Sequence, residues 1–384
     1  MTTPFNRTIP LSLYIHLPWC IQKCPYCDFN SYGITQHPMT EQAYVAALLE
    51  DFTETLPLIW GRRLVSIFFG GGTPSLFSAE SIAEILNGIQ TLLPFNKEHV
   101  EITLEANPGT FEYEKFKDFK AAGINRISLG VQSFDDQQLK RLGRVHSSDN
   151  ALEACRALRE LNVNFNIDLM YGLPHQTIES ALSDLHTAIT CEPKHLSWYH
   201  LTMEPNTVFY QRPPEGLPND DFVADMEDAG RAYLASAGLQ RYEVSAYARE
   251  GFESVHNLNY WTFGDYVGIG AGAHGKITDA STGVITRHTK QKVPANYLNP
   301  ELPFTSSTRA LNADELPVEF MMNALRLKNG FEWDEFESRT GLSRAVLMPA
   351  LEHARDDGFV LMDDQRVWPT DHGYLFLNNL LGYF

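Results

Sequence analysis

The feature that most constrains the fold is a regular alternation of short apolar runs with longer amphipathic stretches. In residues 40–56, Tyr44, Leu48 and Phe52 fall on one helical face. Strands that alternate with helices predict parallel pairing. We therefore expect an α/β fold, an incomplete (β/α)6 TIM-like barrel whose open side admits a large substrate, with a doubly wound sheet as the alternative. The six apolar runs are Leu13–His16, Val65–Phe69, Glu101–Leu104, Arg126–Gly130, Phe165–Met170 and Leu196–Leu201.

The amino-acid composition of the chain changes after Gly283. Residues 290–312 are rich in Pro, Ser, Thr and Asn, which is typical of a linker. Residues 313–384 carry amphipathic segments and a predicted hairpin that turns at Asp363 and Asp364. The sequence therefore predicts a partial barrel over 1–289, a linker over 290–312, and a small helical, winged-helix-like domain over 313–384.

Composition and charge narrow the class of protein. The chain has 384 residues, of which 43% are hydrophobic and 20% charged, as in ordinary globular enzymes. It shows neither an apolar leader nor a run near the roughly 20 apolar residues of a membrane span, so we expect a cytoplasmic protein. The formal charge of −18 argues against nucleic acid as a partner. Cys155 and Cys191 fall in helical segments as expected buried free thiols.

Three cysteines, Cys20, Cys24 and Cys27, lie within eight residues. Pro25 prevents a regular helix there, so the thiols sit on a loop that follows a strand. Three thiolates at this spacing can hold three corners of a [4Fe–4S] cluster and leave the fourth iron open to a small molecule. A zinc site completed by a nearby histidine and a glutaredoxin-type dithiol at Cys24 and Cys27 are the alternatives.

Polar and glycine residues follow the later predicted strands. The loop Gly70-Gly71-Gly72-Thr73-Pro74 comes directly after a strand, where glycines let the backbone approach a ligand or make a tight turn. Together, polar side chains at successive strand ends predict one binding crevice, although each alone can be a surface or capping residue. In it, Asp168 can accept hydrogen bonds from ribose hydroxyls, Glu105 can hold an ammonium group, and Arg144 can pair with a carboxylate.

The motifs that carry this chemistry resemble those of the radical S-adenosylmethionine superfamily. More narrowly, they resemble the oxygen-independent coproporphyrinogen III oxidase-like group over nearly the whole chain. The resemblance implies that Cys20, Cys24 and Cys27 hold the cluster, whose open iron binds S-adenosylmethionine; no catalytic residue is assigned. The matching motifs include Tyr14-Ile-His-Leu-Pro-Trp-Cys, Cys24-Pro-Tyr-Cys-Asp-Phe, Glu105-Ala-Asn-Pro-Gly, Gly130-Val-Gln-Ser-Phe, Leu142-Gly-Arg-Val-His and Asp168-Leu-Met-Tyr-Gly-Leu-Pro. The positions that match the family's S-adenosylmethionine contacts are Tyr14, Tyr26, Gly71, Gly72, Thr73, Glu105, Gln132, Arg144 and Asp168.

Within this group, three features favour the heme-chaperone branch over the oxidases. The oxidases carry a further cysteine where this chain has Phe29, and a longer arm than the 19 residues before Cys20. The segment His256-Asn-Leu-Asn-Tyr-Trp resembles the signature in which the chaperones place a heme ligand. Without that resemblance, the same residues read as a helix cap with a core aromatic pair.

The resemblance thus implies three cofactors: a [4Fe–4S] cluster, S-adenosylmethionine, and heme bound at His256. The implied partners are an electron donor for the cluster and heme-accepting proteins, including membrane-bound respiratory enzymes; a homodimer is left open. The alternatives are coproporphyrinogen III decarboxylation and radical tailoring of another substrate.

A glycine-rich motif downstream, Gly268-Ile-Gly270-Ala-Gly272-Ala273, looks like a dinucleotide fingerprint. It lies late in the chain, and no acidic partner follows about 20 residues on. We expect a close-packed turn beside the heme site instead.

Overall fold

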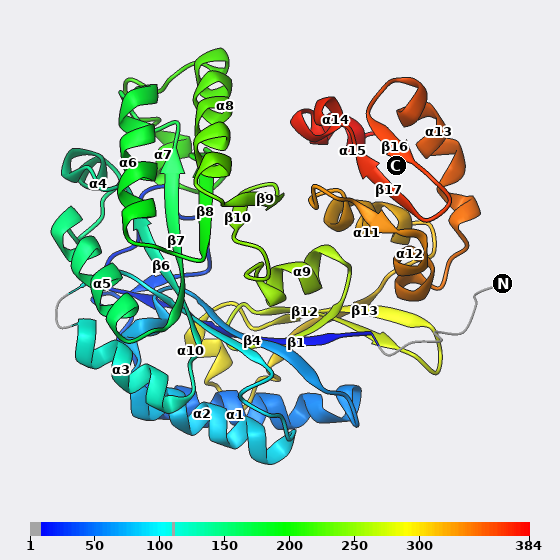
Figure 1. The fold of residues 1–384 in the computed structure, drawn as a ribbon. Helices are drawn as coiled ribbons and strands as arrows, with labels where there is room; N and C mark the ends of the chain where they lie inside the picture. The colour runs from blue at the N-terminus through cyan, green and yellow to red at the C-terminus, as the bar shows by residue number, and fades with distance from the viewer. Residues whose placement is uncertain (1–8, 110–111) are drawn as a thin grey trace.

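The six predicted apolar runs are the six strands that build the barrel wall in the computed structural model, which describes residues 9–109 and 112–384 (Figure 1). Each pairs in parallel with the next one along the chain. Most of their residues are buried, which is why these segments read as apolar runs. The strands are β1 (Leu11–Leu17), β4 (Leu64–Gly71), β5 (Glu101–Ala106), β6 (Arg126–Gln132), β7 (Asn164–Tyr171) and β8 (His195–His200).

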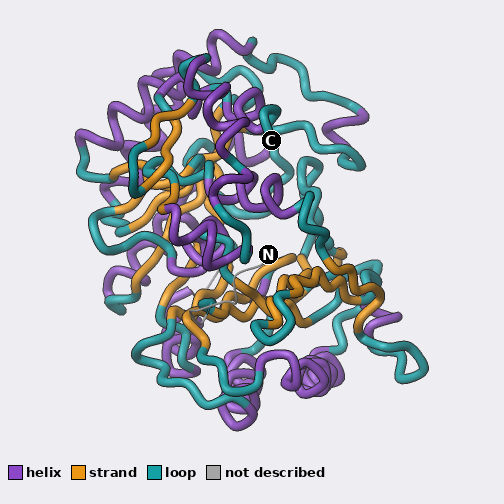
Figure 2. Tube along the Cα trace, turned by 90° about the vertical axis from the view of Figure 1, so that its right-hand side faces the viewer, coloured by secondary structure: helices purple, strands orange, loops and turns teal. Residues whose placement is uncertain are grey.

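Helices between these strands cover the outer face of the sheet, as Figures 1 and 2 show from two sides. In the first of them, Tyr44, Leu48 and Phe52 are buried as predicted, while Thr40 stands at the N-cap without a capping hydrogen bond from its side chain. No helix in the described part of the chain combines the length and apolar character needed to cross a membrane. The helices between the strands are α1 (Glu41–Ile59), α2 (Ala79–Leu92), α3 (Glu112–Ala122), α4 (Asp136–Arg141), α5 (Ser148–Glu160) and α6 (Ile178–Thr190), and α7 (Val208–Gln211) and α8 (Asp220–Ser236) follow β8.

The sheet continues beyond the predicted strands at both edges. On one side β11 (Asp265–Ile269) pairs in parallel with β1 and leads into antiparallel β12 (His274–Asp279), β13 (Val284–Lys290) and β14 (Thr305–Ala310). On the other side lie β10 (Ala246–Ala248) and β9 (Gln240–Glu243). Among the described strands β8 does not pair back onto β1, and the order from β1 to β8 never reverses. The expected incomplete barrel is therefore observed, and the doubly wound alternative is not.

Residues 290–312, read from composition as a linker, are more ordered than that reading implies. They contain α10 (Pro294–Tyr297) and β14, which pairs with β13 at the edge of the sheet. The side chains of β14 are mostly exposed, so an edge strand here needs no apolar residues. This stretch is thus partly ordered, and the division of the chain into a barrel, a linker and a C-terminal domain remains a prediction.

The C-terminal segment forms a second hydrophobic core above β12 and β13 (Figure 1). Phe320 and Phe336 pack in it beside Phe263 and Ile285, which precede the C-terminal segment, so the two parts share a continuous interface. The predicted hairpin at Asp363 and Asp364 is present. The elements are α11 (Leu316–Ala324), β15 (Phe331–Glu332), α12 (Trp333–Thr340), α13 (Met348–Asp356), β16 (Val360–Met362), β17 (Arg366–Pro369), α14 (Asp371–Leu375) and α15 (Leu377–Leu381).

A buried charge cluster fixes β11 against its neighbours. Asp265 is fully buried and accepts hydrogen bonds from Arg62, Lys276 and Thr278 at 2.8 to 2.9 Å. Burial alone raises the pKa of this carboxyl, but the charges of Lys276 and Arg62 outweigh it and hold the pKa below its usual range. These contacts join β11 to β12 and to the turn before β4, at residues that sequence spacing does not connect.

Candidate functional site

A cavity of about 1240 Å³ opens at the carboxyl ends of the barrel strands. Its volume exceeds the roughly 300–1,000 Å³ of a typical small-molecule pocket, so more than one ligand fits. The predicted site residues line it with one exception, because Gly71 lies beside it and reaches it through a backbone hydrogen bond to Glu105. The predicted residues that line the cavity are Tyr14, Cys20, Cys24, Tyr26, Cys27, Gly72, Thr73, Glu105, Gln132, Arg144, Asp168 and His256.

The cysteine segment begins in β2 (Trp19–Cys20) and continues in the loop that leads to β3 (Tyr32–Gly33), with which β2 pairs in parallel. Cys20 ends β2 and is buried, whereas Cys24 and Cys27 lie in the following loop, which turns through a 3.1 Å hydrogen bond from the backbone N–H of Cys27 to the carbonyl of Cys24. Burial raises the pKa of the Cys20 and Cys27 thiols, so a metal must displace their protons to bind.

All three cysteines line the cavity. Within the described residues, no three His, Cys, Asp or Glu side chains are placed so that they could together hold a single metal ion. In a [4Fe–4S] cluster each thiolate binds a different iron, so the ligands need not converge on one point. The three thiols at the cavity wall are thus compatible with the predicted cluster.

The Gly70–Pro74 loop packs against the cysteine loop. The backbone N–H groups of Gly72 and Thr73 donate to the carbonyls of Leu17 and Trp19 at 2.9 and 2.7 Å. A Cβ at residue 72 would lie 2.4 Å from the carbonyl oxygen of Trp19, and Gly71 has a φ of +119°. Glycine is therefore required here for the approach of two backbone segments to each other. The Gly70–Pro74 loop and the cysteine loop therefore form adjoining parts of the cavity wall.

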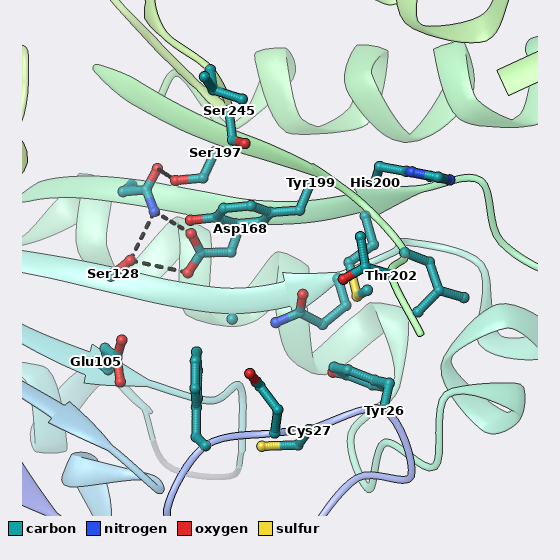
Figure 3. A pocket seen from close by; sticks show the side chains of 18 of the residues that line it. Tyr26, Cys27, Glu105, Ser128, Asp168, Ser197, Tyr199, His200, Thr202 and Ser245 are labelled. Carbon is teal, nitrogen blue, oxygen red and sulfur yellow. Dashed lines mark hydrogen bonds between the residues drawn. The ribbon is translucent and has the colours of Figure 1, made fainter. Parts of the chain in front are cut away.

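Two carboxyl groups from neighbouring parts of the barrel lie in the cavity (Figure 3). Burial and the charge of Asp168 raise the pKa of Glu105 to about 8, although the N–H of Gly71 donates to it at 3.2 Å. Burial also raises the pKa of Asp168, against the opposing effect of its hydrogen bonds. An ammonium group or ribose hydroxyls at this place would stabilise both ionised carboxylates.

Three polar residues that the sequence analysis did not identify hold Asp168 in place (Figure 3). Ser128 and Asn166 donate to its carboxylate at 3.0 and 2.6 Å, and Asn166 also donates to Ser128 and accepts from Ser197. Asn166 and Asp168 stand two positions apart on β7, so both point into the barrel. That alternation was a usable signal, whereas the contribution of Ser128 and Ser197 depends on neighbouring strands.

Arg144 joins the cysteine loop to the barrel. It donates through Nη2 to Asn107 Oδ1 at 2.6 Å and to the carbonyl of Gly130 at 2.7 Å, while Nη1 lies 3.7 Å from the sulfur of Cys24. Asn107 in turn donates to Thr73 Oγ1 at 2.8 Å. Asn107 therefore connects two predicted contact residues, and its place in the Glu105-Ala-Asn-Pro-Gly motif was the available signal.

Gln132 and two tyrosines complete the predicted set. Gln132 has a positive φ of 72° at a register shift in the pairing of β6 with β7, and it lines the cavity. A non-glycine residue held in this conformation marks a site where the surroundings compensate for strain. Tyr14 contacts His16 Nδ1 through its hydroxyl at 2.8 Å, and burial raises the pKa of Tyr14 and Tyr26.

His256 is the second residue of the short helix α9 (Val255–Trp261), and it lines the cavity. Its Nδ1 lies 2.7 Å from Glu101 Oε1, and its ring packs 4.2 Å from that of Phe68. Burial lowers the pKa of His256, which keeps the ring neutral at neutral pH. A neutral imidazole with a carboxylate on one nitrogen is the arrangement that metal-binding histidines use.

Glu101 was not identified from the sequence, because it lies 155 positions before His256. Burial raises the pKa of its carboxyl, but the hydrogen bond and the charge of His256, with a smaller effect of the charge of Arg126, outweigh burial and bring the pKa to about 2. Glu101 is therefore ionised at neutral pH. The reading of His256 as only a cap is incomplete, since Ser254 makes the capping bond and His256 faces the cavity.

The Gly268–Ala273 segment forms the expected close-packed turn after β11. A Cβ at residue 270 would lie 2.3 Å from the carbonyl oxygen of His16, and one at residue 272 would lie 2.2 Å from the amide of Asn30. The turn thus supports the base of the cysteine loop.

An open parallel barrel with three cysteines at its carboxyl edge defines a radical S-adenosylmethionine protein. Residues 14–188 match the Radical SAM superfamily model, and residues 311–376 match the HemN C-terminal domain. The structure superposes on Escherichia coli coproporphyrinogen III oxidase, HemN, with a TM-score of 0.82 and 25% identity, over 98% of this chain and 90% of that one.

Relatives that match over nearly the whole chain narrow the assignment from the superfamily to one family. The chain is 50% identical to heme chaperone HemW of Haemophilus influenzae and 48% identical to that of Escherichia coli, over 98% of each chain. It is 35% identical to the mouse mitochondrial radical S-adenosyl methionine domain-containing protein 1, over 99% of this chain and 88% of the other. The chain belongs to the HemW family of heme chaperones.

Proposed function

We propose that this protein is a heme chaperone that binds a [4Fe–4S] cluster, S-adenosylmethionine and heme, and delivers heme to respiratory or other hemoproteins. The observation that carries the proposal is the pairing of a neutral, buried His256 with the ionised Glu101 in the same cavity as the three cysteines. Near-identity in length and 50% identity to a heme chaperone support it.

Cys20, Cys24 and Cys27 would hold the cluster at one end of the cavity. Beside it, Glu105 would hold the ammonium group of S-adenosylmethionine, and Asp168 its ribose hydroxyls. The polar residues proposed around the same ligand are Tyr14, Tyr26, Gly71, Gly72, Thr73, Gln132 and Arg144. When bound, the cluster and S-adenosylmethionine supply one-electron reductive chemistry at the sulfonium.

His256 would bind heme iron through Nε2. Its contact with Glu101 would keep the proton on Nδ1 and leave the lone pair of Nε2, which lies 3.4 Å from Ser254 Oγ, for the iron. Asn257 and Tyr260, on the same helix, also line the cavity, and Tyr260 offers an aromatic ring near the histidine. Heme thus occupies the part of the cavity that lies toward α9.

Heme titration and transfer test this function. Anaerobically reconstituted protein should bind hemin with a Soret shift that His256→Ala reduces, and the loaded protein should restore a heme-free b-type cytochrome. His288→Ala is a control outside the cavity lining. Failure of the wild type to bind hemin, or an unchanged spectrum and affinity in His256→Ala, would reject the proposed role of His256.

The likeness to HemN keeps coproporphyrinogen III decarboxylation as a second candidate. Phe29 stands where the oxidases carry a further cysteine, and it is 59% exposed at the cavity wall. Incubation with coproporphyrinogen III, S-adenosylmethionine and reductant, beside a genuine oxidase, separates the two. Protoporphyrinogen formed only by the oxidase supports the chaperone function, while its formation by this protein would reject a chaperone-only function.

The proposal includes an electron donor for the cluster, heme-accepting proteins that include membrane-bound enzymes, and a cytoplasmic location. A homodimer is compatible with it. Size-exclusion chromatography with light scattering, with and without hemin, measures the oligomeric state.

A further inference from the structure

Two arginines face the cavity where the barrel meets the C-terminal segment. Arg241 belongs to β9, and Arg326 follows α11, so the two come from opposite sides of this junction. Leu375, the last residue of α14, and Phe376, which follows it, line the same end of the cavity and are 54% and 46% exposed. This end therefore combines two guanidinium groups, each with one glutamate neighbour, and an open apolar edge.

Contacts across the junction orient Arg241 while leaving part of it available. Its Nε donates to the carbonyl of Val244 at 3.1 Å, and Nη2 lies 3.2 Å from Glu227 Oε1. Its guanidinium lies 4.8 Å from the ring centroid of Tyr374. Among the described residues Nη1 has no hydrogen-bond partner, so one side of a pre-positioned guanidinium can receive an anion.

Arg326 is held in a similar way. Its guanidinium lies 4.3 Å from the ring centroid of Trp261, and Nη2 is 3.6 Å from Glu243 Oε2. Its Nε is buried and has no partner within the described chain. Because Arg326 lines the cavity, the part of its guanidinium beyond the buried Nε is what a ligand can reach.

We propose that Arg241 and Arg326 form a carboxylate-binding subsite that holds the two propionates of heme at this junction. The inference rests on the proposed function and extends it to the orientation of the ligand. Stacked guanidiniums with free N–H edges favour carboxylates, and the apolar edge at Leu375 and Phe376 favours a flat apolar body. Heme carries both parts in one molecule.

His256 and Arg326 line the same cavity. Trp261, which stacks with Arg326, follows His256 by five residues, so the two positions are about 7.5 Å apart along α9 and about 140° apart around it. Trp261 thus holds Arg326 from another side of α9, and Arg326 itself is the group that reaches the cavity.

Esterification of the propionates tests the subsite without changing the protein. Wild-type protein should bind hemin at least tenfold more tightly than iron protoporphyrin IX dimethyl ester in the same detergent. Arg241→Gln/Arg326→Gln should lower hemin affinity and abolish that preference. Arg355→Gln, a matched exposed arginine on α13 outside the cavity, should retain both.

The outcomes separate the two levels of the proposal. Equal affinity of the wild type for both compounds would overturn the subsite and leave heme binding intact, as would a preference that persists in the double variant. Failure of the wild type to bind either compound would count against the proposed function itself. The ester comparison decides the question even if the double variant does not fold, because it uses wild-type protein.

Discussion

Glu101→Gln is the substitution that most directly tests how the tertiary structure prepares His256. Glu101 Oε1 lies 2.7 Å from His256 Nδ1 and accepts the backbone N–H of His256 at 3.1 Å, and Oε2 accepts the N–H of Val255 at 3.1 Å. The glutamine side chain lacks the negative charge, and its NH2 group replaces one of the two accepting oxygens. That NH2 group then faces another donor, either a backbone N–H or the guanidinium of Arg126. The imidazole then loses its fixed orientation and tautomer.

The size of the effect follows from this geometry. A hydrogen bond to a charged group contributes about 1.5–3 kcal/mol, and about 1.4 kcal/mol corresponds to a tenfold change in affinity. Loss of a carboxylate that orients a metal-binding histidine typically costs about 10–100-fold. We therefore expect heme affinity to fall about 10–100-fold in Glu101→Gln, with recovery of part of the loss in Glu101→Asp.

The assay is anaerobic hemin titration followed by the Soret band, with the spin state read from the absorption and EPR spectra. A change of ligation alters the spin state, which a purely structural role of Glu101 would not do. Glu98→Gln, an exposed glutamate three positions earlier, serves as the control. An affinity within twofold of wild type and an unchanged spectrum in folded Glu101→Gln would refute the positioning role.

Three further outcomes are expected. Cys24→Ser should lose the charge-transfer absorption of the reconstituted cluster; full iron and sulfide content would reject the ligand assignment. Because the pKa of Glu105 is raised to about 8 in the folded state, this group destabilises the protein as pH rises from 4.5 toward 8. Glu105→Gln should therefore flatten the pH dependence of the unfolding free energy of the ligand-free protein and weaken S-adenosylmethionine binding; an unchanged slope contradicts this. Asp265→Asn leaves Lys276 buried without its counter-charge and should cost about 3–5 kcal/mol in urea unfolding. Asp118→Asn, at an exposed position on α3, should change the unfolding free energy by less than about 0.5 kcal/mol. Equal urea midpoints for the two variants would exclude a structural role for the buried charges around Asp265.

Local patterns predicted the elements that depend on local chemistry. The apolar runs correspond to β1 and β4–β8, and the face defined by Tyr44, Leu48 and Phe52 is the buried face of α1. The cysteine spacing predicted a loop at Cys24 and Cys27, next to Cys20, because Pro25 prevents a regular helix there. Polar residues at strand ends meet in one cavity because parallel strands present their carboxyl ends at the same edge.

Composition does not exclude ordered elements where exposure is high. The Pro-, Ser- and Thr-rich stretch before residue 312 contains α10 and β14, since an edge strand exposed on its outer side needs no apolar alternation. The glycines of the Gly70–Pro74 loop were expected to let the backbone approach a ligand or make a tight turn, and Gly72 is required by its close approach to the carbonyl of Trp19. In both cases the partner that decides the role lies outside the local segment.

The sequence by itself determined the class of fold, the cluster-binding loop and most of the cavity lining, because these follow from hydrophobic periodicity and from motifs of a few residues. Only the tertiary structure decided that β11 pairs with β1, that Glu101 contacts His256, and that Arg241 and Arg326 line the same cavity. These contacts join positions far apart in the chain, and their partners are selected by packing and buried charge, which local sequence patterns do not encode.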